Sequence, residues 1–287
     1  MNAQLPVTRD LRLAYLASIA VAIIMTIASV ISLLDWRSIY PGTDPKLLSL
    51  FLGQDLLNVV VGLPVLVGGM WLVRRGSLIG LLLWPGGLFY VLYDYAYYAL
   101  GAPFNALFIP YLVLMTASAY ATIAIVASID GTAVRQRLLS TVRPRLTGGY
   151  LVGLALLFTA LWTAMSLSAL ASGTQLDLVP RVVTTLDLTV QLPALLVGGV
   201  LLWRRESLGY VVAFGLLLQA STYLVGLSAI SVLQETLIGA PIDPVAVYPG
   251  IVVGALCLAL MASFVRGAAV PLAPRSRRTI QSAPVIP

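Results

Sequence analysis

The sequence has no histidine, one cysteine (Cys257) and one lysine (Lys46). Without histidine the chain cannot build a bis-histidine haem site, a Ser-His-Asp relay, an HExxH zinc site or an imidazole proton shuttle. A single cysteine cannot form an intramolecular disulfide or an iron–sulfur site, and Cys257 lies in an apolar run, where we expect a small buried side chain. Lys46 lies in a polar stretch, which excludes the Schiff base of a retinal protein. We therefore expect no cofactor and no metal site.

Charge is also scarce. Charged residues make up 10% of the 287 residues and hydrophobic residues 60%, whereas soluble domains have roughly 25% and 45–50%. The 17 basic and 11 acidic side chains are too few to cover the surface of a soluble protein of this length. The composition therefore predicts an all-α, polytopic integral membrane protein.

Eight apolar runs are long enough to cross a hydrocarbon core of about 30 Å, which takes roughly 20 residues at helical rise. They lie near residues 13–34, 50–73, 78–100, 106–129, 148–171, 183–203, 208–232 and 247–265. The second and sixth runs are the weakest, because Asp55 and Asp187 interrupt them. The first run is too long for a signal-peptide core and lacks a clear cleavage site, so we expect an uncleaved anchor.

The basic residues fall on alternate loops. Fourteen of the 17 lie on one side of the predicted bilayer, which leaves Arg37, Lys46 and Arg181 for the other. Because Lys and Arg accumulate in short cytoplasmic loops, we expect both termini to be cytoplasmic, in a plasma-membrane protein. This asymmetry accounts for the sequence pI of about 9.6. It makes membrane lipids the expected partners of the basic tail, and not a nucleic acid.

An internal match divides the chain into halves. Residues 66–78 (LVGGMWLVRRGSL) and 196–208 (LVGGVLLWRRESL) are identical at nine of thirteen positions, at an offset of 130. We expect two parallel four-helix repeats, because an even number of spans restores the direction of the chain. The predicted parts are a cytoplasmic N-terminus at 1–12, a first repeat at 13–129, a cytoplasmic basic linker at 130–147, a second repeat at 148–265 and a disordered basic cytoplasmic tail at 266–287.

Three acids lie inside predicted spans, where a charged group is costly and so marks a functional candidate. Asp55, Asp94 and Asp187 each lie 17 to 19 residues from the basic boundary, about 25–28 Å at helical rise, and so share one depth. With polar neighbours on their helix faces they are predicted to line a cavity open to the external side. The predicted binding residues are Asp55, Asn58, Tyr93, Asp94, Tyr97, Asp187 and Gln191. The structural alternative is that these acids reach the outer interface or fix helix register through hydrogen bonds.

A Tyr-rich helix end runs into Gly-x-Pro-Phe-Asn in the stretch from Tyr93 to Tyr111, YDYAYYALGAPFNALFIPY. It resembles a pattern in a family of uncharacterised bacterial multi-pass membrane proteins, over residues 78–129. The resemblance implies a multi-pass fold and no particular activity. Gly101 and Pro103 are expected to end one helix, and Asn105 to cap the next.

Three classes of function stay open at this point. A transporter or permease of a small cationic or amphipathic molecule is favoured by the repeat and the intramembrane acids. A noncatalytic subunit, scaffold or receptor in a larger membrane complex, with membrane-protein partners or as a homo-oligomer, fits the short loops. A lipid-modifying enzyme is disfavoured, because the arginine pairs and the acids lie at opposite sides of the predicted bilayer.

The basic asymmetry predicts the topology. Reporter fusions after Leu100 and Asp243 should read as external, and a fusion after Thr141 as internal. Alkaline phosphatase and green fluorescent protein fusions measure this directly. A reversal at any of the three sites contradicts the assignment.

Overall fold

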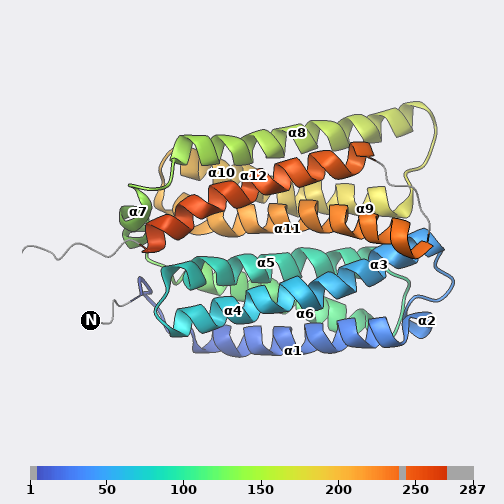
Figure 1. The fold of residues 1–287 in the computed structure, drawn as a ribbon, viewed down its shortest axis with the longest axis horizontal. Coiled ribbons are helices and arrows are strands. Elements are labelled where there is room, and N and C mark those ends of the chain that lie inside the picture. The colour runs from blue at the N-terminus through green and yellow to red at the C-terminus, as the bar shows by residue number, and fades with distance from the viewer. Residues whose placement is uncertain (1–4, 239–243, 270–287) are drawn as a thin grey trace, which may run out of the picture.

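The computed structural model describes residues 5–238 and 244–269. Within these residues the chain is helical, apart from one antiparallel bridge between Val7 and Ile129 (Figure 1). The all-α prediction is therefore confirmed for the described chain.

The helices follow one another along the whole described chain. In order they are α1 (Arg12–Leu34), α2 (Trp36–Ile39), α3 (Pro45–Leu57), the π-helical turn η1 (Asn58–Gly62), α4 (Leu63–Arg74), α5 (Leu78–Gly101), α6 (Phe108–Val126), α7 (Gly131–Leu138), α8 (Pro144–Ala171), α9 (Leu178–Leu186), the π-helical turn η2 (Asp187–Gln191), α10 (Leu192–Trp203), α11 (Ser207–Ile238) and α12 (Pro244–Ala269).

Eight stretches of the described chain are long and apolar enough to span a membrane. They are Arg12–Leu34, Pro45–Arg74, Leu78–Gly101, Phe108–Ser128, Pro144–Ala171, Leu178–Trp203, Ser207–Glu235 and Val247–Ala269. The number agrees with the sequence, but the second stretch begins at Pro45, earlier than the predicted residue 50. The Asp44 side chain accepts hydrogen bonds from the Lys46 and Leu47 amides, so a polar cap starts this helix before the apolar run does.

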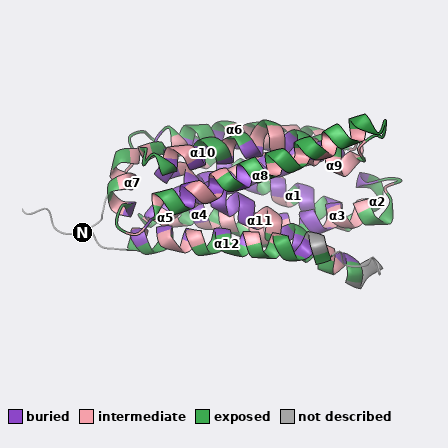
Figure 2. Cartoon of the chain, turned by 90° about the horizontal axis from the view of Figure 1, so that it is seen from above, coloured by how far each residue is buried: buried purple, intermediate pink, exposed green. Residues whose placement is uncertain are grey.

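Two helices form the centre of the molecule. Helices α1 to α6 lie on one side and α8 to α12 on the other, with α5 and α11 facing each other between them (Figure 1). Of the apolar window of α5, 78% is buried, against 17% for α8. Figure 2 shows the same contrast between inner and outer helices. Most faces of α5 and α11 are therefore turned toward the interior of the bundle.

Two glycines allow α5 and α11 to touch through their backbones. A Cβ atom on Gly86 would lie 2.6 Å from the Gly215 Cα atom, and a Cβ on Gly215 would lie 2.9 Å from the Gly86 Cα atom. No side chain fits between the helices at this point. The two halves of the chain therefore meet at their closest at this glycine pair.

Each half contains a helix with a π-helical turn in its middle. In both cases a Leu-Pro pair directly follows this turn and begins the next α-helical segment. The Leu63 amide donates to the Asn58 carbonyl, and the Leu192 amide to the Asp187 carbonyl, each five residues back. Proline lacks an amide hydrogen and its ring clashes with the carbonyl four residues before it. A wider turn ahead of Pro64 and Pro193 relieves that clash, as π-bulges commonly do inside longer helices.

The turns that follow α4 and α10 have matching backbone hydrogen bonds at an offset of 129. The Ser77 amide donates to the Leu72 carbonyl, and the Glu206 amide to the Leu201 carbonyl. The residues before them, Gly76 and Arg205, have φ angles of 76° and 61°. The sequence identity between residues 66–78 and 196–208 has an offset of 130 instead. The difference arises because the Gly-Gly pair lies one residue further from the preceding proline in the second half than in the first.

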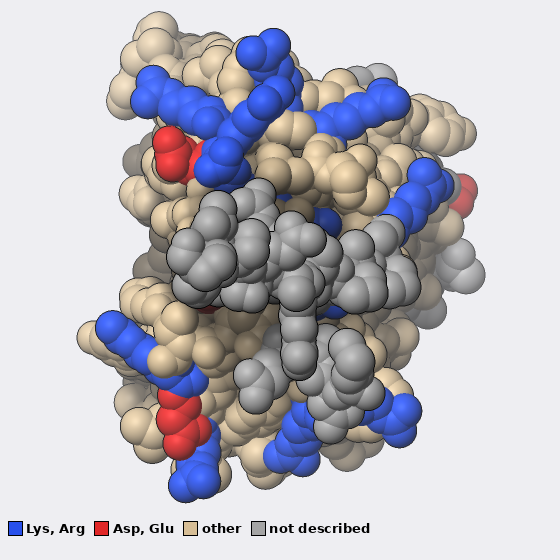
Figure 3. Space-filling view, turned by 90° about the vertical axis from the view of Figure 1, so that its left-hand side faces the viewer, with Lys and Arg blue, Asp and Glu red and all other residues tan. Residues whose placement is uncertain are grey.

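Arginines gather at one end of the bundle (Figure 3). This end carries the N-terminal segment, the turns after α4 and α10, and α7, which lies inside the stretch predicted as a linker. Thr8 donates its amide hydrogen to the Ser128 carbonyl, which ties the start of the chain to the end of α6. Of the tail predicted at 266–287, residues 266–269 continue α12, and the rest lies outside the described residues.

The glycine contact predicts a specific sensitivity of the fold. Gly86→Ala should lower the thermal unfolding temperature, because the new methyl group meets backbone atoms that cannot rotate away, at a cost of about 1–3 kcal/mol. Gly153→Ala on α8 is the matched control, since nothing lies within 4 Å of its Cβ position. Melting curves in detergent measure both. Equal unfolding temperatures for the two variants would count against the contact.

Candidate functional site

A chain of buried polar side chains crosses the interior between α3, η1, α5 and α11. Gln54 Nε2 donates to Tyr90 Oη over 3.0 Å, and Tyr90 Oη donates to Asn58 Oδ1 over 2.7 Å. Asn58 Nδ2 then donates to Asp94 Oδ2 over 2.7 Å. Tyr223 Oη donates to the other oxygen of Asp94 over 3.1 Å. Asn58 and Asp94 are both 0% exposed, so Asp94 is enclosed by its hydrogen-bond partners.

Asp187 lies in a second polar cluster, beside α8. It is the first residue of η2, and its oxygens accept hydrogen bonds from Tyr93 Oη over 2.5 Å and from Trp162 Nε1 over 2.7 Å. The donors come from α5 and α8, so helices of both halves hold this carboxyl group. Asp187 is only partly buried.

A cavity of about 120 Å³ opens next to Asp187. Asp187, Gln191, Tyr93 and Tyr223 contribute polar side chains to its lining, and most of its remaining wall is aliphatic or aromatic. The Gln191 Oε1 atom is buried without a hydrogen-bond partner. The cavity therefore combines acceptor oxygens and aromatic rings with a largely apolar surface.

Tyr223 connects this cavity to the enclosed acid. Its ring lies edge-to-face with Tyr93, with centroids 4.7 Å apart, while its hydroxyl group donates to Asp94. Asp94 and Asp187 are thus linked through two tyrosines. They do not share the one concavity expected from the sequence, because α5 turns Asp94 toward Asn58 while Asp187 faces the cavity.

Asp55 belongs to a third, closed position. Tyr40 Oη donates to Asp55 Oδ2 over 2.7 Å, and the two residues are 1% and 2% exposed. Tyr40 lies in the loop between α2 and α3, and burial followed by the neighbouring Asp55 raises the pKa of its hydroxyl group above the usual value. Tyr40 therefore stays protonated and acts as the donor.

Tyr97 is the predicted residue least involved in polar contacts. Its ring packs against Phe51 and Tyr98, with centroids 5.9 and 6.2 Å away, and its hydroxyl has no hydrogen bond within the described residues. The seven predicted residues therefore separate into the pair Asn58–Asp94, the cavity group Tyr93–Asp187–Gln191, and Asp55 and Tyr97 apart from both. A ligand-binding role for these residues stays a prediction.

None of the three acids has a basic partner. In residues 5–238 and 244–269 one ion pair is present, between Arg12 and Asp10 at the surface. The donors to Asp55, Asp94 and Asp187 are all uncharged. An isolated carboxylate is costly away from water, and no basic side chain of the described residues offsets that cost at these three positions. No three acidic or cysteine side chains of the described chain come close enough to hold a metal ion.

Sequence reasoning missed Tyr40 and Trp162. Trp162 contributes one indole N–H from an otherwise apolar helix, and Tyr40 lies in a loop 15 residues from Asp55. No spacing rule connects either residue to its acid. Tyr90 and Gln54 had a detectable signal, since each shares a polar face with a candidate on its own helix. Tyr223 shares a polar face only with Gln219 and Thr222, which are not candidates.

Comparisons with protein families, with curated proteins and with solved structures find no match to this chain. Functional inference therefore rests on the site itself.

The closed Tyr40–Asp55 contact predicts a stability effect. Tyr40→Phe should destabilise the protein by about 1–3 kcal/mol, because it leaves a buried acid without its donor. Tyr248→Phe removes the same hydroxyl from a residue that is 65% exposed, and should have little effect. Thermal unfolding of both variants in detergent measures the difference. An unchanged Tyr40→Phe protein would show that the contact contributes nothing.

Proposed function

We propose that this protein is an integral membrane protein that binds a small amphipathic cation at Asp187 and carries it across the bilayer. The observation that carries the proposal is the Asp187 carboxyl group at the wall of a largely apolar cavity, with uncharged donors only. The eight apolar helices are consistent with an integral membrane protein.

The lining of the cavity indicates the chemistry of the occupant. An ammonium group finds the Asp187 carboxylate, the unpartnered Gln191 oxygen and the rings of Tyr93 and Tyr223 in the lining. The leucines and Phe158 of the same lining suit its alkyl or aryl part. The volume of about 120 Å³ approaches that of an engineered cavity of about 150 Å³ that holds benzene. The occupant is therefore small.

Transport, beyond binding, is supported by the organisation of the chain. We take the two halves to be parallel repeats, and α4 and α10 support this with equal bounds at an offset of 129 and the same turn after each. Single π-turns inside α-helices are frequent at functional sites. Here they are η1 and η2, which begin with Asn58 and Asp187.

A permanently charged probe tests the proposal. Butyltrimethylammonium should bind the full chain in nanodiscs and accumulate in proteoliposomes. Asp187→Asn should reduce both about tenfold or more, since a charge-assisted contact is worth on the order of 1.5–3 kcal/mol.

Asp177→Asn provides the control, because it removes the same charge from an exposed residue just before α9. Binding or uptake that is equal in the Asp187→Asn protein and the unmodified chain would overturn the proposal. Binding without uptake would overturn the carrier function and leave a receptor.

A further inference from the structure

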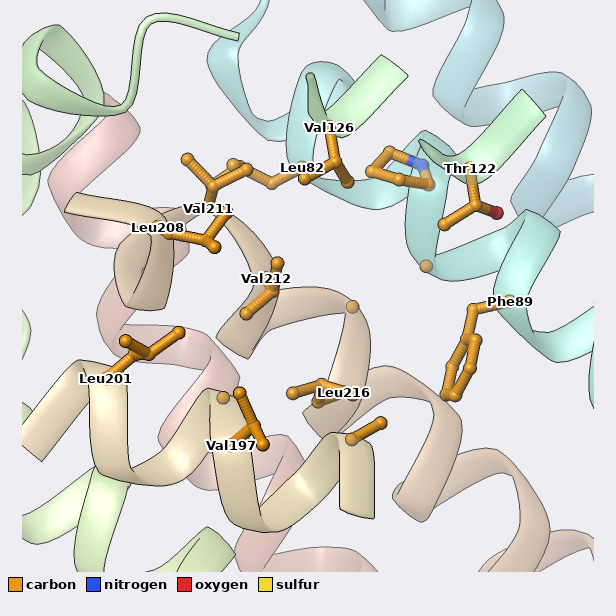
Figure 4. A pocket seen from close by; sticks show the side chains of 15 residues that line it. Leu82, Phe89, Thr122, Val126, Val197, Leu201, Leu208, Val211, Val212 and Leu216 are labelled. Atoms are coloured by element: carbon orange, nitrogen blue, oxygen red, sulfur yellow. The ribbon is translucent and has the colours of Figure 1, made fainter. Parts of the chain in front are cut away.

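A second concavity lies between the two halves, toward the arginine-rich end. This groove of about 240 Å³ runs between α5 and α6 on one side and α10 and α11 on the other (Figure 4). Thr122 is the one polar side chain in its lining, and the Gly86–Gly215 contact forms part of its wall. The groove shares no lining residue with the cavity at Asp187.

The groove opens sideways, onto the outer surface of the bundle. Val197 is 58% exposed and Leu208 is 45% exposed, and both line the groove. Both belong to stretches apolar enough to span a membrane. The medium at this depth is hydrocarbon, so an acyl chain fills such an opening without loss of polar contacts.

Unpaired positive charge lies where the groove ends. On α10, Val197 and Leu201 line the groove, and the helix ends at Trp203, directly before Arg204 and Arg205. Both arginines are exposed, and neither has an ion pair, a ring contact or a side-chain hydrogen bond within the described residues. Leu208, beyond the turn, lines the groove again, so the arginine turn borders its end.

The corresponding turn of the first half differs. Arg74 lies over the Tyr15 ring at 5.2 Å and Arg75 over the Trp71 ring at 3.9 Å. Those two guanidinium groups already have partners. In the second half, Arg135 of α7 and Arg205 both lie near Tyr210, and the Arg135 Nε atom is buried without an acceptor.

We infer that this groove binds one anionic glycerophospholipid, with an acyl chain along the groove and the phosphate group at Arg204 and Arg205. Glu206 in the same turn carries one opposing charge, so the turn keeps one net positive charge. Arginine binds phosphate through a planar fork of donors, which makes it suited to a headgroup at the edge of the hydrocarbon. Anionic lipids are also attracted to this end as a whole, where the other arginines gather.

Native mass spectrometry tests the inference. The full chain is reconstituted in vesicles of equal parts phosphatidylglycerol and phosphatidylcholine and then extracted, and the mass of the protein shows which lipid it retains. The unmodified protein should retain one phosphatidylglycerol in preference to phosphatidylcholine. In the double variant Arg204→Gln/Arg205→Gln this preference should fall about tenfold. Arg74→Gln/Arg75→Gln, with the same charge change at the same end, should keep it.

A separate variant tests whether an acyl chain occupies the groove. Val197→Trp places an indole over the groove and should release the bound lipid. Val252→Trp, at an equally exposed position of α12 (58%), should retain it. The inference is overturned if both lipids are retained equally, if the Arg204→Gln/Arg205→Gln protein keeps its preference, or if the two tryptophan variants retain the same amount. Because all six substituted positions are exposed, folding is expected to survive, and thermal unfolding checks it.

Discussion

The backbone contact between Gly86 and Gly215 is the constraint on which the interior depends. It brings α5 and α11 so close that no side chain fits between them at this point, and so fixes which residues of the two halves face each other. Two turns further along, the space between the two helices is filled by the rings of Tyr93 and Tyr223, which pack edge-to-face. The polar network and the cavity lie at this wider level, and the apolar groove lies beside the glycines.

Hydropathy and the alternation of arginines were sufficient to predict eight apolar helices and a basic end, because both depend on the composition of short segments. They could not predict which buried donor meets which acid. The Tyr40 hydroxyl reaches Asp55 from a loop, and the Trp162 indole reaches Asp187 from a helix that looks uniformly apolar. The pairing of Asn58 with Asp94 was within reach, since each lies on a polar face of its own helix, but its enclosure was not.

The distribution of charge separates two kinds of chemistry along the bundle. Arginines gather at one end of the bundle, and the three acids inside the apolar stretches have only amide, indole and phenol donors. A buried acid that already had an arginine partner would have no need of a cation from outside. The missing partner at Asp187, together with an open space next to it, is therefore what distinguishes this position from the closed contact at Asp55.

The rigid phenol group of Tyr223 contacts both the cavity and Asp94. Its ring forms part of the cavity wall, and its hydroxyl group, at the far end of the same ring, donates to Asp94. Because the phenol group is rigid, its ring and its hydroxyl oxygen move together when the side chain rotates about the bonds of its Cβ atom. A molecule that enters the cavity and tilts the ring also moves the hydroxyl relative to Asp94, so a change in the cavity reaches a hydrogen bond that joins the two halves.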